Sequence, residues 1–327
     1  MSTHAARNRK ENGAICVLTI GGLDPSGGAG LTADARAQAA FGAHCCPVAT
    51  AVIAQNTRGV FEIEPVSPRI LAAQIDRLLE DIAPRAVKIG MVPGLEHARV
   101  IAARLRLLRD LPIIIDTVFA PSAGPGFADD ATVRYIAEQW LPLCDIVTPN
   151  TIEAARLCGA PVDDLESMKR AAGAIAKRFG PRHVLVKGGH LPLNHSALNV
   201  AVTTTSDINP TTAATANDAI KNTQNQSDAL VADALVADAL VADALVADAL
   251  VATDILFDGA TMTELRANRV AGYGVRGTGC LLASALAAQR ARDVPVEEAA
   301  RRAKVWLTQQ IRTAKAIGGG SRVAFDA

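Results

Sequence analysis

The stretch AICVLTIGGLDPSGGAGLTADARAQAAFGA, residues 14–43, gives the clearest indication of the fold class. It begins with an apolar run, continues through a glycine-rich turn and ends in an alanine-rich segment that stops at Gly42. An apolar run without alternation predicts a strand that is buried on both faces, and the alanine-rich segment predicts a helix. The stretch therefore predicts one strand–turn–helix unit of a parallel sheet.

Further apolar runs follow along the chain, separated by stretches with helical periodicity. The runs cover residues 46–54, 86–91, 112–119, 144–149 and 183–189, and the clearest helical stretches cover 67–81 and 96–110. This alternation predicts an α/β protein with a three-layer fold, in which helices flank a mainly parallel central sheet. Ligands of such sheets bind at the carboxyl ends of the strands, so the residues after each run are candidates for chemistry.

Residues 193–253 interrupt this pattern. The segment begins Thr- and Asn-rich and then repeats DALVA five times from Asp228 to Ala252. A period of five matches neither the strand period of about 2 nor the helix period of about 3.6, so no face stays apolar. After it, DILFDGATMTELRANRV (254–270) predicts a hairpin. We expect one domain over 14–327 with a low-complexity loop insert at about 193–253, and a flexible tail at 1–13 without a signal-peptide core.

The charge and cysteine content exclude several functional classes. Lys plus Arg equals Asp plus Glu at 33 each, which gives no argument for a basic surface that binds nucleic acid or membranes. Aromatic residues make up 3%, too few for a base-stacking platform. The six cysteines include no Cys-x-x-Cys pair and indicate reduced thiols in a cytoplasmic protein. We therefore expect neither a nucleic-acid nor a membrane partner.

Three motifs follow predicted strands, and each has a structural explanation beside the chemical one. GGLDPSGGAGLTAD (21–34) permits close approach of a ligand to the backbone, but it also suits a plain strand-to-helix turn. In TPNTIEA (148–154), Asn150 and Glu153 either support Mg²⁺ or cap a helix. In VKGGH (186–190), Lys187 either neutralises a phosphate or precedes a surface turn.

A fourth motif, GYGVRGTGCLL (272–282), runs from a glycine-rich turn into a helical pattern. Unpaired N–H groups and the positive end of the helix dipole make such a turn an anion site. The dipole should favour the thiolate of Cys280, which makes this residue a candidate base or hydrogen-bond partner for an alcohol. The alternative is a small residue that packs the first helical turn.

The order of these motifs resembles that of the hydroxymethylpyrimidine and phosphomethylpyrimidine kinases of thiamine biosynthesis, within the ribokinase-like superfamily. The matching segments are DPSGGAG (24–30), AQNTRGV (54–60), KIGM (88–91), DTV (116–118), TPNTIEA (148–154), KGGH (187–190) and GTGC (277–280). The resemblance implies a ribokinase-like fold and a homodimer. It also implies transfer of phosphate from ATP, with Mg²⁺, to 4-amino-5-hydroxymethyl-2-methylpyrimidine and then to its monophosphate.

The resemblance further implies roles for individual residues. Gln55 would hydrogen-bond the aminopyrimidine, and Cys280 would stand where sugar kinases place a catalytic Asp. The turn Gly277, Thr278, Gly279 would present N–H groups to the transferred phosphoryl group. The ATP residues would be Lys187, Thr278 and Asn150, and the metal residues Asp116 and Glu153. The pyrimidine pocket would be lined by Gly22, Ala29, Asp34, Ile53, Met91 and Val118.

The chain also departs from the family pattern. Leu23 stands where the family usually has Ser or Thr, FAPSAG (119–124, with Ala120, Pro121 and Ser122) lacks a loop lysine, and Arg276 and Leu281 flank the GTGC turn differently. Arg276 offers a replacement charge for the missing lysine. Two other functions stay open: a pyridoxal or related vitamin kinase, and a degenerate pyrimidine-binding regulatory module. Gln55 and KIGM favour the pyrimidine, and retention of the phosphate and metal residues favours catalysis.

Overall fold

The computed structural model describes residues 13–119, 128–189, 191, 251–270 and 274–324. The predicted tail, except for Gly13, and most of the predicted insert lie outside these residues. Within the described part, nine strands form one sheet in the order β3-β2-β1-β4-β5-β6-β7-β8-β9. A second, two-stranded sheet pairs β10 (Val275–Arg276) with β11 (Arg322–Val323).

The large sheet is parallel in its centre and antiparallel near its edges. The parallel strands are β1 (Cys16–Leu23), β2 (His44–Asn56), β4 (Ala86–Ile89), β5 (Ile113–Ile115), β6 (Ile146–Val147) and β7 (His183–Val186). On one side β3 (Gly59–Pro65) runs antiparallel to β2, and on the other β8 (Val251–Phe257) runs antiparallel to β7. The predicted mainly parallel sheet is confirmed.

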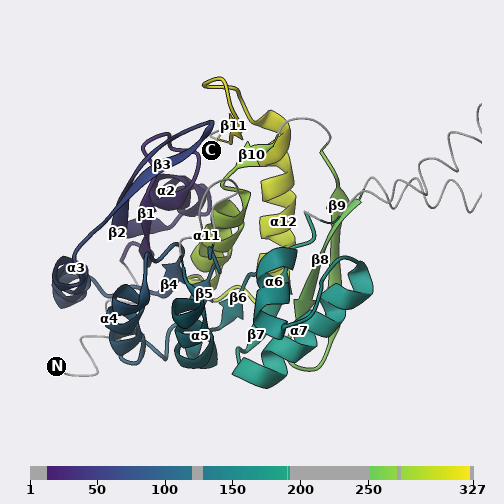
Figure 1. Ribbon diagram of the computed structural model, residues 1–327, viewed down its shortest axis with the longest axis horizontal. Coiled ribbons are helices and arrows are strands. Elements are labelled where there is room, and N and C mark those ends of the chain that lie inside the picture. Colours follow the sequence, from purple (N-terminus) through teal and green to yellow (C-terminus); the bar gives the residue numbers. More distant parts are fainter. Residues whose placement is uncertain (1–12, 120–127, 190, 192–250, 271–273, 325–327) are drawn as a thin grey trace, which may run out of the picture. The chain divides into compact units, whose positions relative to one another are not determined.

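Helices cover both faces of this sheet, which confirms the predicted three layers (Figure 1). One face carries α2 (Gly30–Ala40), α11 (Thr278–Arg290) and α12 (Val296–Thr313), and α11 packs against α2, α12, β4 and β5. The other face carries α3 (Pro68–Asp81), α4 (Leu95–Leu105), α5 (Asp130–Gln139), α6 (Thr151–Cys158) and α7 (Leu165–Phe179). None of the helices in the described ranges has the length and apolarity that a membrane span requires.

The boundaries of two elements differ from the sequence prediction in an informative way. The predicted helix 96–110 ends at Leu105, because the chain turns there to enter β5 at Ile113. The predicted strand 112–119 keeps only Ile113–Ile115 in the sheet. The residues that follow, Asp116 to Phe119, leave the sheet, with Val118 N–H donating to Asp116 O and Phe119 N–H donating to Thr117 O. The end of this apolar run thus forms part of the site.

The predicted hairpin is present. Strands β8 and β9 (Met262–Asn268) are neighbours in the sheet, and the Asp258 carboxylate accepts hydrogen bonds from the N–H groups of Ala260 and Thr261 in the turn. Strand β8 begins at Val251, two residues before the expected end of the insert at about residue 253. The last residues of the repeat region are therefore strand.

A buried carboxylate joins the amino ends of β6 and β7 to α11. Asp145 accepts a hydrogen bond from Arg290 Nε at 2.7 Å, and His183 Nδ1 lies 3.5 Å from its other oxygen. Burial lowers the pKa of His183, but hydrogen bonding and attraction to Asp145 outweigh this and raise the pKa above the ordinary value. The imidazolium is therefore more stable in the folded protein than in the unfolded chain.

This pair predicts a pH dependence of stability. A histidine with a raised pKa stabilises the fold fully below its unfolded pKa of about 6.5, and the contribution is lost as the pH rises through the folded pKa. We expect His183→Gln to lower the free energy of unfolding at pH 5.5 and to have less effect at pH 8.5, measured by urea denaturation. His44→Gln, at an exposed position on β2, is the control. A His183→Gln effect of equal size at both pH values would contradict the prediction.

Candidate active site

The glycine-rich loop after β1 is organised by one buried carboxylate. Asp24, with 1% of its surface exposed, accepts hydrogen bonds from Ser26 N–H at 2.8 Å, Ser26 Oγ at 2.7 Å and Ala29 N–H at 2.9 Å. Gly30 begins α2 with a φ of +56°, and a Cβ there would overlap the Gly22 carbonyl oxygen. Only glycine permits this conformation and this approach of the two backbone segments, so Gly30 is required by the shape of the loop.

The start of α11 rests directly on that loop. Gly277 is the N-cap residue with a φ of 74°, and a Cβ added to it would overlap the Gly28 carbonyl oxygen and lie 2.9 Å from Ala29 Cα. Thr278, Gly279 and Cys280 follow as the first turn of the helix, whose N–H groups have no partner within the helix. The predicted anion-binding turn thus lies beside the glycine-rich loop.

A buried ion pair points at this turn. Lys187, just after β7, places its Nζ 2.9 Å from Asp116 Oδ1, just after β5, and the two side chains are 14% and 2% exposed. A Cβ on Gly279 would lie 3.1 Å from Lys187 Nζ and 3.6 Å from both Asp116 oxygens. Burial opposes ionisation of Asp116, but attraction to Lys187 and Lys88 holds its pKa below the ordinary value. Both charges of the pair therefore persist at neutral pH.

The motif around Asn150 forms the predicted helix cap. Asn150 Oδ1 accepts from Glu153 N–H at 2.9 Å, and Glu153 Oε2 accepts from Asn150 N–H at 2.8 Å and from Thr117 Oγ1 at 3.0 Å. Asn150 also pairs with Lys187 as a parallel bridge between the strand ends. Burial raises the pKa of Glu153 to about 7, although Lys187 works against the shift. The cap therefore also places a second carboxylate next to Asp116 and Lys187.

The expectation of a favoured thiolate at Cys280 is wrong. Burial raises the pKa of the Cys280 thiol to about 12, and the neighbouring charge of Lys88 offsets this only in part. Desolvation thus outweighs the helix dipole, whose effect is small by comparison. The raised pKa favours the neutral thiol of this half-buried residue at pH 7, and Cys280 is one of the groups that lower the pKa of Asp116.

A second buried ion pair, between Lys88 and Asp34, lies near Cys280. Asp34 was among the predicted site residues, but Lys88 was not. Lys88 Nζ contacts both oxygens of Asp34 at 2.8 and 2.9 Å, and Ser284 Oγ donates to Asp34 Oδ1 at 2.8 Å. Asp34 and Lys88 are both 0% exposed, so Asp34 lies in the interior between β4, α2 and α11. The lone lysine in the apolar strand AVKIGM was the signal in the sequence, because a buried ammonium group requires a partner.

A further buried carboxylate holds the loop that carries Lys187. Asp254 Oδ1 accepts from Gly188 N–H at 2.9 Å, and Asp254 Oδ2 lies 2.7 Å from Lys304 Nζ on α12. Gly188 must be glycine, because a Cβ there would overlap the Thr253 carbonyl oxygen. Sequence reasoning did not single out Asp254 or Lys304, whose pairing across 50 residues has no local signal.

Most of the predicted pyrimidine residues form one apolar group. Ile53 and Met91 are buried together with Ala51, and Val118 packs against them. A Cβ on Gly22 would lie 2.7 Å from Ile53 Cδ1 and 3.6 Å from Met91 Sδ, so the absent side chain leaves room for them. Ala29 lies apart from this group, beside Gly277, and Asp34 is enclosed with Lys88. Four of the six predicted residues thus lie together.

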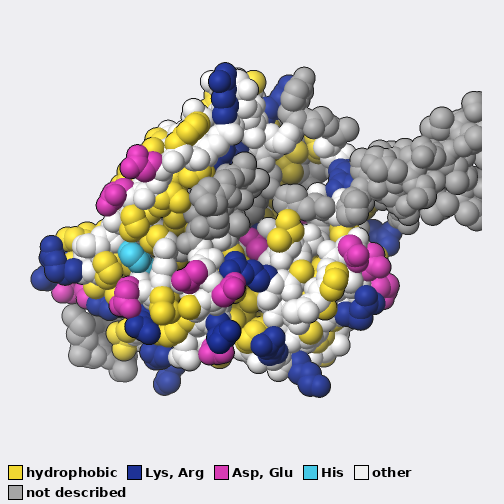
Figure 2. Space-filling view, viewed as in Figure 1, with side chains coloured by type: hydrophobic (Ala, Val, Ile, Leu, Met, Phe, Trp, Pro, Cys, Tyr) yellow, Lys and Arg dark blue, Asp and Glu magenta, His cyan; other side chains and the backbone are white. Residues whose placement is uncertain are grey.

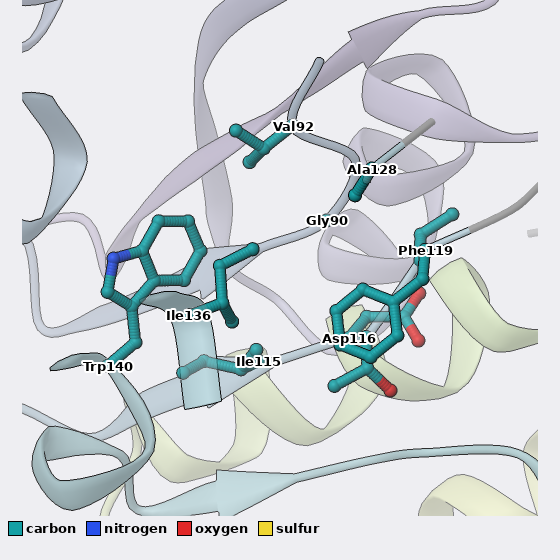
Figure 3. A pocket seen from close by; sticks show the side chains of 10 residues that line it. Gly90, Val92, Ile115, Asp116, Phe119, Ala128, Ile136 and Trp140 are labelled. Atoms are coloured by element: carbon teal, nitrogen blue, oxygen red, sulfur yellow. The ribbon is translucent and has the colours of Figure 1, made fainter. Parts of the chain in front are cut away.

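A small cavity adjoins this group on the Asp116 side (Figure 3). It has about 240 Å³ of space, part of which is open to solvent. Figure 3 shows Asp116 and Phe119 at one end and Trp140 at the other, with Val92 and Ile136 between them. Of the predicted pyrimidine residues, only Val118 lines it. The cavity therefore presents an apolar wall next to a buried carboxylate.

Gln55, the predicted ring-binding residue, contacts one of the residues that depart from the family pattern. Arg276 Nη2 donates to Gln55 Oε1 at 2.9 Å, and Arg276 Nε lies 3.7 Å from Asp24 Oδ2. Leu281 is 2% exposed and packs with Ala33 and Ala37 of α2. Leu23 is 40% exposed, and most of the departing segment 119–124 lies outside the described residues.

The corner formed by Asp116 and Glu153 suits a magnesium ion. Asp116 Oδ2 is buried and has no hydrogen-bond partner, and Mg²⁺ prefers carboxylate oxygens. Across the described residues, no three His, Cys, Asp or Glu side chains are grouped to hold a metal. Mg²⁺ in nucleotide sites commonly uses one or two carboxylates together with water and phosphate oxygens, so two carboxylates are a sufficient donor set.

Comparison with known proteins identifies the family. The model of the family described as phosphomethylpyrimidine kinase matches residues 24–219 and 211–324. The chain belongs to the phosphomethylpyrimidine kinase family. A hydroxymethylpyrimidine/phosphomethylpyrimidine kinase of Aquifex aeolicus is 30% identical over 94% of this chain and 99% of the relative. The thiamine biosynthesis bifunctional protein ThiED of Geobacter sulfurreducens is 34% identical over 93% of this chain, which spans about half (50%) of that relative.

Solved structures agree with this membership. The phosphomethylpyrimidine kinase of Clostridium difficile has a TM-score of 0.65 and 29% identity, covering 91% of this chain and 99% of the other. Bacillus subtilis pyridoxal kinase, solved as an ADP complex, has a TM-score of 0.71 at 22% identity and covers 95% and 98% of the two chains. The second likeness shows the fold alone. The predicted ribokinase-like fold and the predicted family are confirmed.

Proposed function

We propose that the protein transfers the γ-phosphoryl group of ATP to 4-amino-5-hydroxymethyl-2-methylpyrimidine, to its monophosphate, or to both, as part of thiamine biosynthesis. The observation that carries this proposal is the convergence of the Lys187–Asp116 pair on the first turn of α11, which bears Cys280. Membership of the phosphomethylpyrimidine kinase family supports a phosphotransferase, and the names of the full-length relatives support the pyrimidine over other vitamins.

Positioning and charge would supply most of the catalysis, as in other phosphoryl transfers. The N–H groups of Thr278, Gly279 and Cys280 would face the negative charge on the transferred phosphoryl group. Lys187 would approach the same phosphate from the other side, and its ion pair with Asp116 already holds it there. These donors need little rearrangement when the nucleotide binds, since Asp254 fixes the adjoining Gly188 backbone.

With the alcohol as substrate, the reaction forms a bond between the hydroxymethyl oxygen and the γ-phosphorus, breaks the bond from that phosphorus to ADP, and frees the proton of the attacking hydroxyl group. With the monophosphate as substrate, an oxygen of its phosphate group would attack instead. Cys280 would hydrogen-bond to the attacking hydroxyl group of the alcohol. Because its raised pKa favours the neutral thiol at pH 7, it would relay the proton toward an oxygen of the transferred phosphoryl group rather than act as a standing thiolate. Asp116 and Glu153 would hold Mg²⁺, which would neutralise charge on the nucleotide phosphates.

Product formation tests the proposal and its alternatives together. The purified full chain is incubated with Mg-ATP and, separately, the pyrimidine alcohol, its monophosphate and pyridoxal, and ADP and the phosphorylated product are followed. We expect product from at least one pyrimidine. Phosphorylation of pyridoxal alone would instead identify a pyridoxal kinase. Binding of the pyrimidine without any product would identify a regulatory module, and no binding of either pyrimidine would also overturn the proposal.

We also propose that the protein is a homodimer, and an apolar patch on β1–β3 supports this. The patch consists of Leu23, Val52 and Phe61, which are 40%, 52% and 70% exposed. Leu23 and Val52 are register partners on neighbouring strands. Figure 2 shows hydrophobic side chains on the side of the molecule where Figure 1 labels β2 and β3. A second copy of the chain that covered these side chains would bury their apolar surface away from water, which favours association.

The patch gives a prediction about size in solution. We expect Phe61→Lys to convert a dimer to a monomer in light scattering after size-exclusion chromatography, because an ammonium group would be buried without a partner. Leu107→Lys, at a position that is 79% exposed after α4, is the control and should remain dimeric. A wild-type monomer, or a Phe61→Lys dimer, would contradict the prediction.

The cytoplasmic location expected from the sequence remains a proposal. All six cysteines are free thiols, which is consistent with a reducing compartment. Fractionation of cells that express the chain, with a cytosolic marker as reference, tests this location.

A further inference from the structure

We propose that Arg276 is a specificity-determining residue that positions Gln55: it fixes the orientation of the amide, so that the Gln55 nitrogen faces the ligand and donates to a ring nitrogen. This inference rests on the proposed function, because it concerns the ring that Gln55 would bind. Arg276 does not need to touch the ligand for this role. It acts through the Gln55 side chain, 221 residues away in the sequence.

The position of Arg276 is strongly constrained. Its backbone lies in β10, where Arg276 pairs with Val323 of β11. Its side chain lies against Gly28, where an added Cβ would be 3.2 Å from Arg276 Cδ and 3.4 Å from Arg276 Cβ. Only 14% of the side chain is exposed. The guanidinium group therefore reaches Gln55 from a packed stem rather than from a mobile surface side chain.

The chemistry of the contact sets the amide orientation. A guanidinium group has only hydrogen-bond donors, so it must meet the amide oxygen and not the amide nitrogen. The 2.9 Å contact from Arg276 Nη2 to Gln55 Oε1 has this polarity. Without such a partner, an amide can turn over and offer either a donor or an acceptor. With it, Gln55 Nε2 remains for the ligand, and that donor matches the lone pair of an aromatic ring nitrogen.

The charges around Arg276 favour this role over direct phosphate binding. Arg276 Nε lies 3.7 Å from Asp24 Oδ2 and is buried without a hydrogen-bond partner. The charge of the guanidinium group is thus balanced within the protein by Asp24, which already accepts three hydrogen bonds from its own loop. The sequence suggested that Arg276 replaces the missing phosphate-binding lysine. That role would require the guanidinium charge to face the substrate instead of Asp24.

A double-mutant cycle between Arg276 and Gln55 tests the inference. Arg276→Met, Gln55→Ala and the double variant are compared for binding of the pyrimidine alcohol by calorimetry without nucleotide, and for KM and kcat. Methionine keeps part of the packing against Gly28. We expect each single substitution to weaken binding by about 10- to 100-fold, and the double variant to be no weaker than Gln55→Ala. The kcat value should change by less than about 3-fold, since no group at the phosphoryl site is removed.

Three further variants sharpen the test. Gln55→Glu keeps the contact with Arg276 but removes the donor, so it should weaken binding as much as Gln55→Ala does. Arg276→Lys retains a donor and should recover part of the loss seen with Arg276→Met. Arg104→Met is the matched control, because Arg104 is 22% exposed and pairs with Asp76 between α3 and α4; it should bind like the wild type.

Additive losses in the double variant would overturn the inference, as would a loss confined to the monophosphate, which would make Arg276 a phosphate ligand. If the wild type binds the pyrimidine and the losses are non-additive, but no phosphorylated product forms, the proposed function is overturned and the inference is kept. If product forms but the losses are additive, the proposed function is kept and the inference is overturned. If the wild-type protein binds no pyrimidine, both are overturned.

Discussion

Replacing Cys280 with alanine is expected to lower kcat by about 100- to 1,000-fold and to change the KM for the pyrimidine by less than about 3-fold. The thiol lies in the first turn of α11 and is one of the sources of the low pKa of Asp116. Its removal would take away the hydrogen-bond partner of the reacting hydroxyl group but leave the ring contacts intact. Steady-state kinetics with saturating Mg-ATP measure both constants.

Cys280→Ser separates a relay from a thiolate base. A hydroxyl group both donates and accepts, so this variant should keep kcat within about 10-fold of the wild type. Because burial raises the pKa of the thiol to about 12, the wild type and Cys280→Ser should also share the shape of their pH–rate profiles between about pH 6 and 9. A collapse of Cys280→Ser to the level of Cys280→Ala would indicate that the thiolate itself acts. An unchanged kcat in Cys280→Ala would make the thiol a packing residue.

Replacing Lys187 with methionine is expected to lower kcat/KM for ATP by about 100- to 1,000-fold. The ammonium group lies 2.9 Å from Asp116 and 3.1 Å from the position that a Cβ of Gly279 would occupy, so it faces both the carboxylate and the anion-binding turn. The variant would lose the cation nearest the phosphates and would leave Asp116 without its partner. A coupled assay of ADP release, with ATP varied, measures the loss.

The Lys187 result needs a control for folding, because an unpaired buried carboxylate can cost about 3–5 kcal/mol of stability. Thermal unfolding of Lys187→Met shows whether the protein remains folded at the assay temperature. Lys169→Met removes a lysine that pairs with Glu166 and Glu264 outside the site, and should retain kcat/KM. Lys187→Arg should restore only part of the activity, since the larger guanidinium group has little room beside Gly279. Full activity of a folded Lys187→Met variant would overturn the role of Lys187.

The elements that sequence reasoning predicted well are those that short-range patterns define. The apolar run at 14–20 and the alanine-rich segment after it became β1 and α2, and the DG turn became the β8–β9 hairpin. The position of Asp116 and Lys187 at the carboxyl ends of β5 and β7, on either side of β6, also follows from the topology of a parallel sheet. The particular pairing of their side chains does not, because it depends on packing between strands 71 residues apart.

The thiol state of Cys280 shows why local rules failed. The helix dipole is visible in the sequence, whereas the desolvation that opposes it depends on how tightly α11 packs against α2 and the sheet. The contacts of Arg276 with Gln55 and Asp24 could not be predicted from the sequence for the same reason, because β10 approaches the loop after β1 only in the folded chain. The roles of these side chains in binding and catalysis remain predictions.

The antiparallel pairing of β7 with β8 has a consequence for how this chain tolerates added sequence. Val186 and Ile255 are register partners, and Asp254 holds the Gly188 backbone, so the two ends of the long connection are fixed side by side by contacts within the sheet and its adjoining loop. The entropy of closing a flexible loop rises only with the logarithm of its length, by about 0.6 kcal/mol for each doubling. A tandem repeat can therefore expand between these strands at little thermodynamic cost, while the same expansion in the eight-residue stretch from Gly277 to Ser284 would destroy both the turn and its helix.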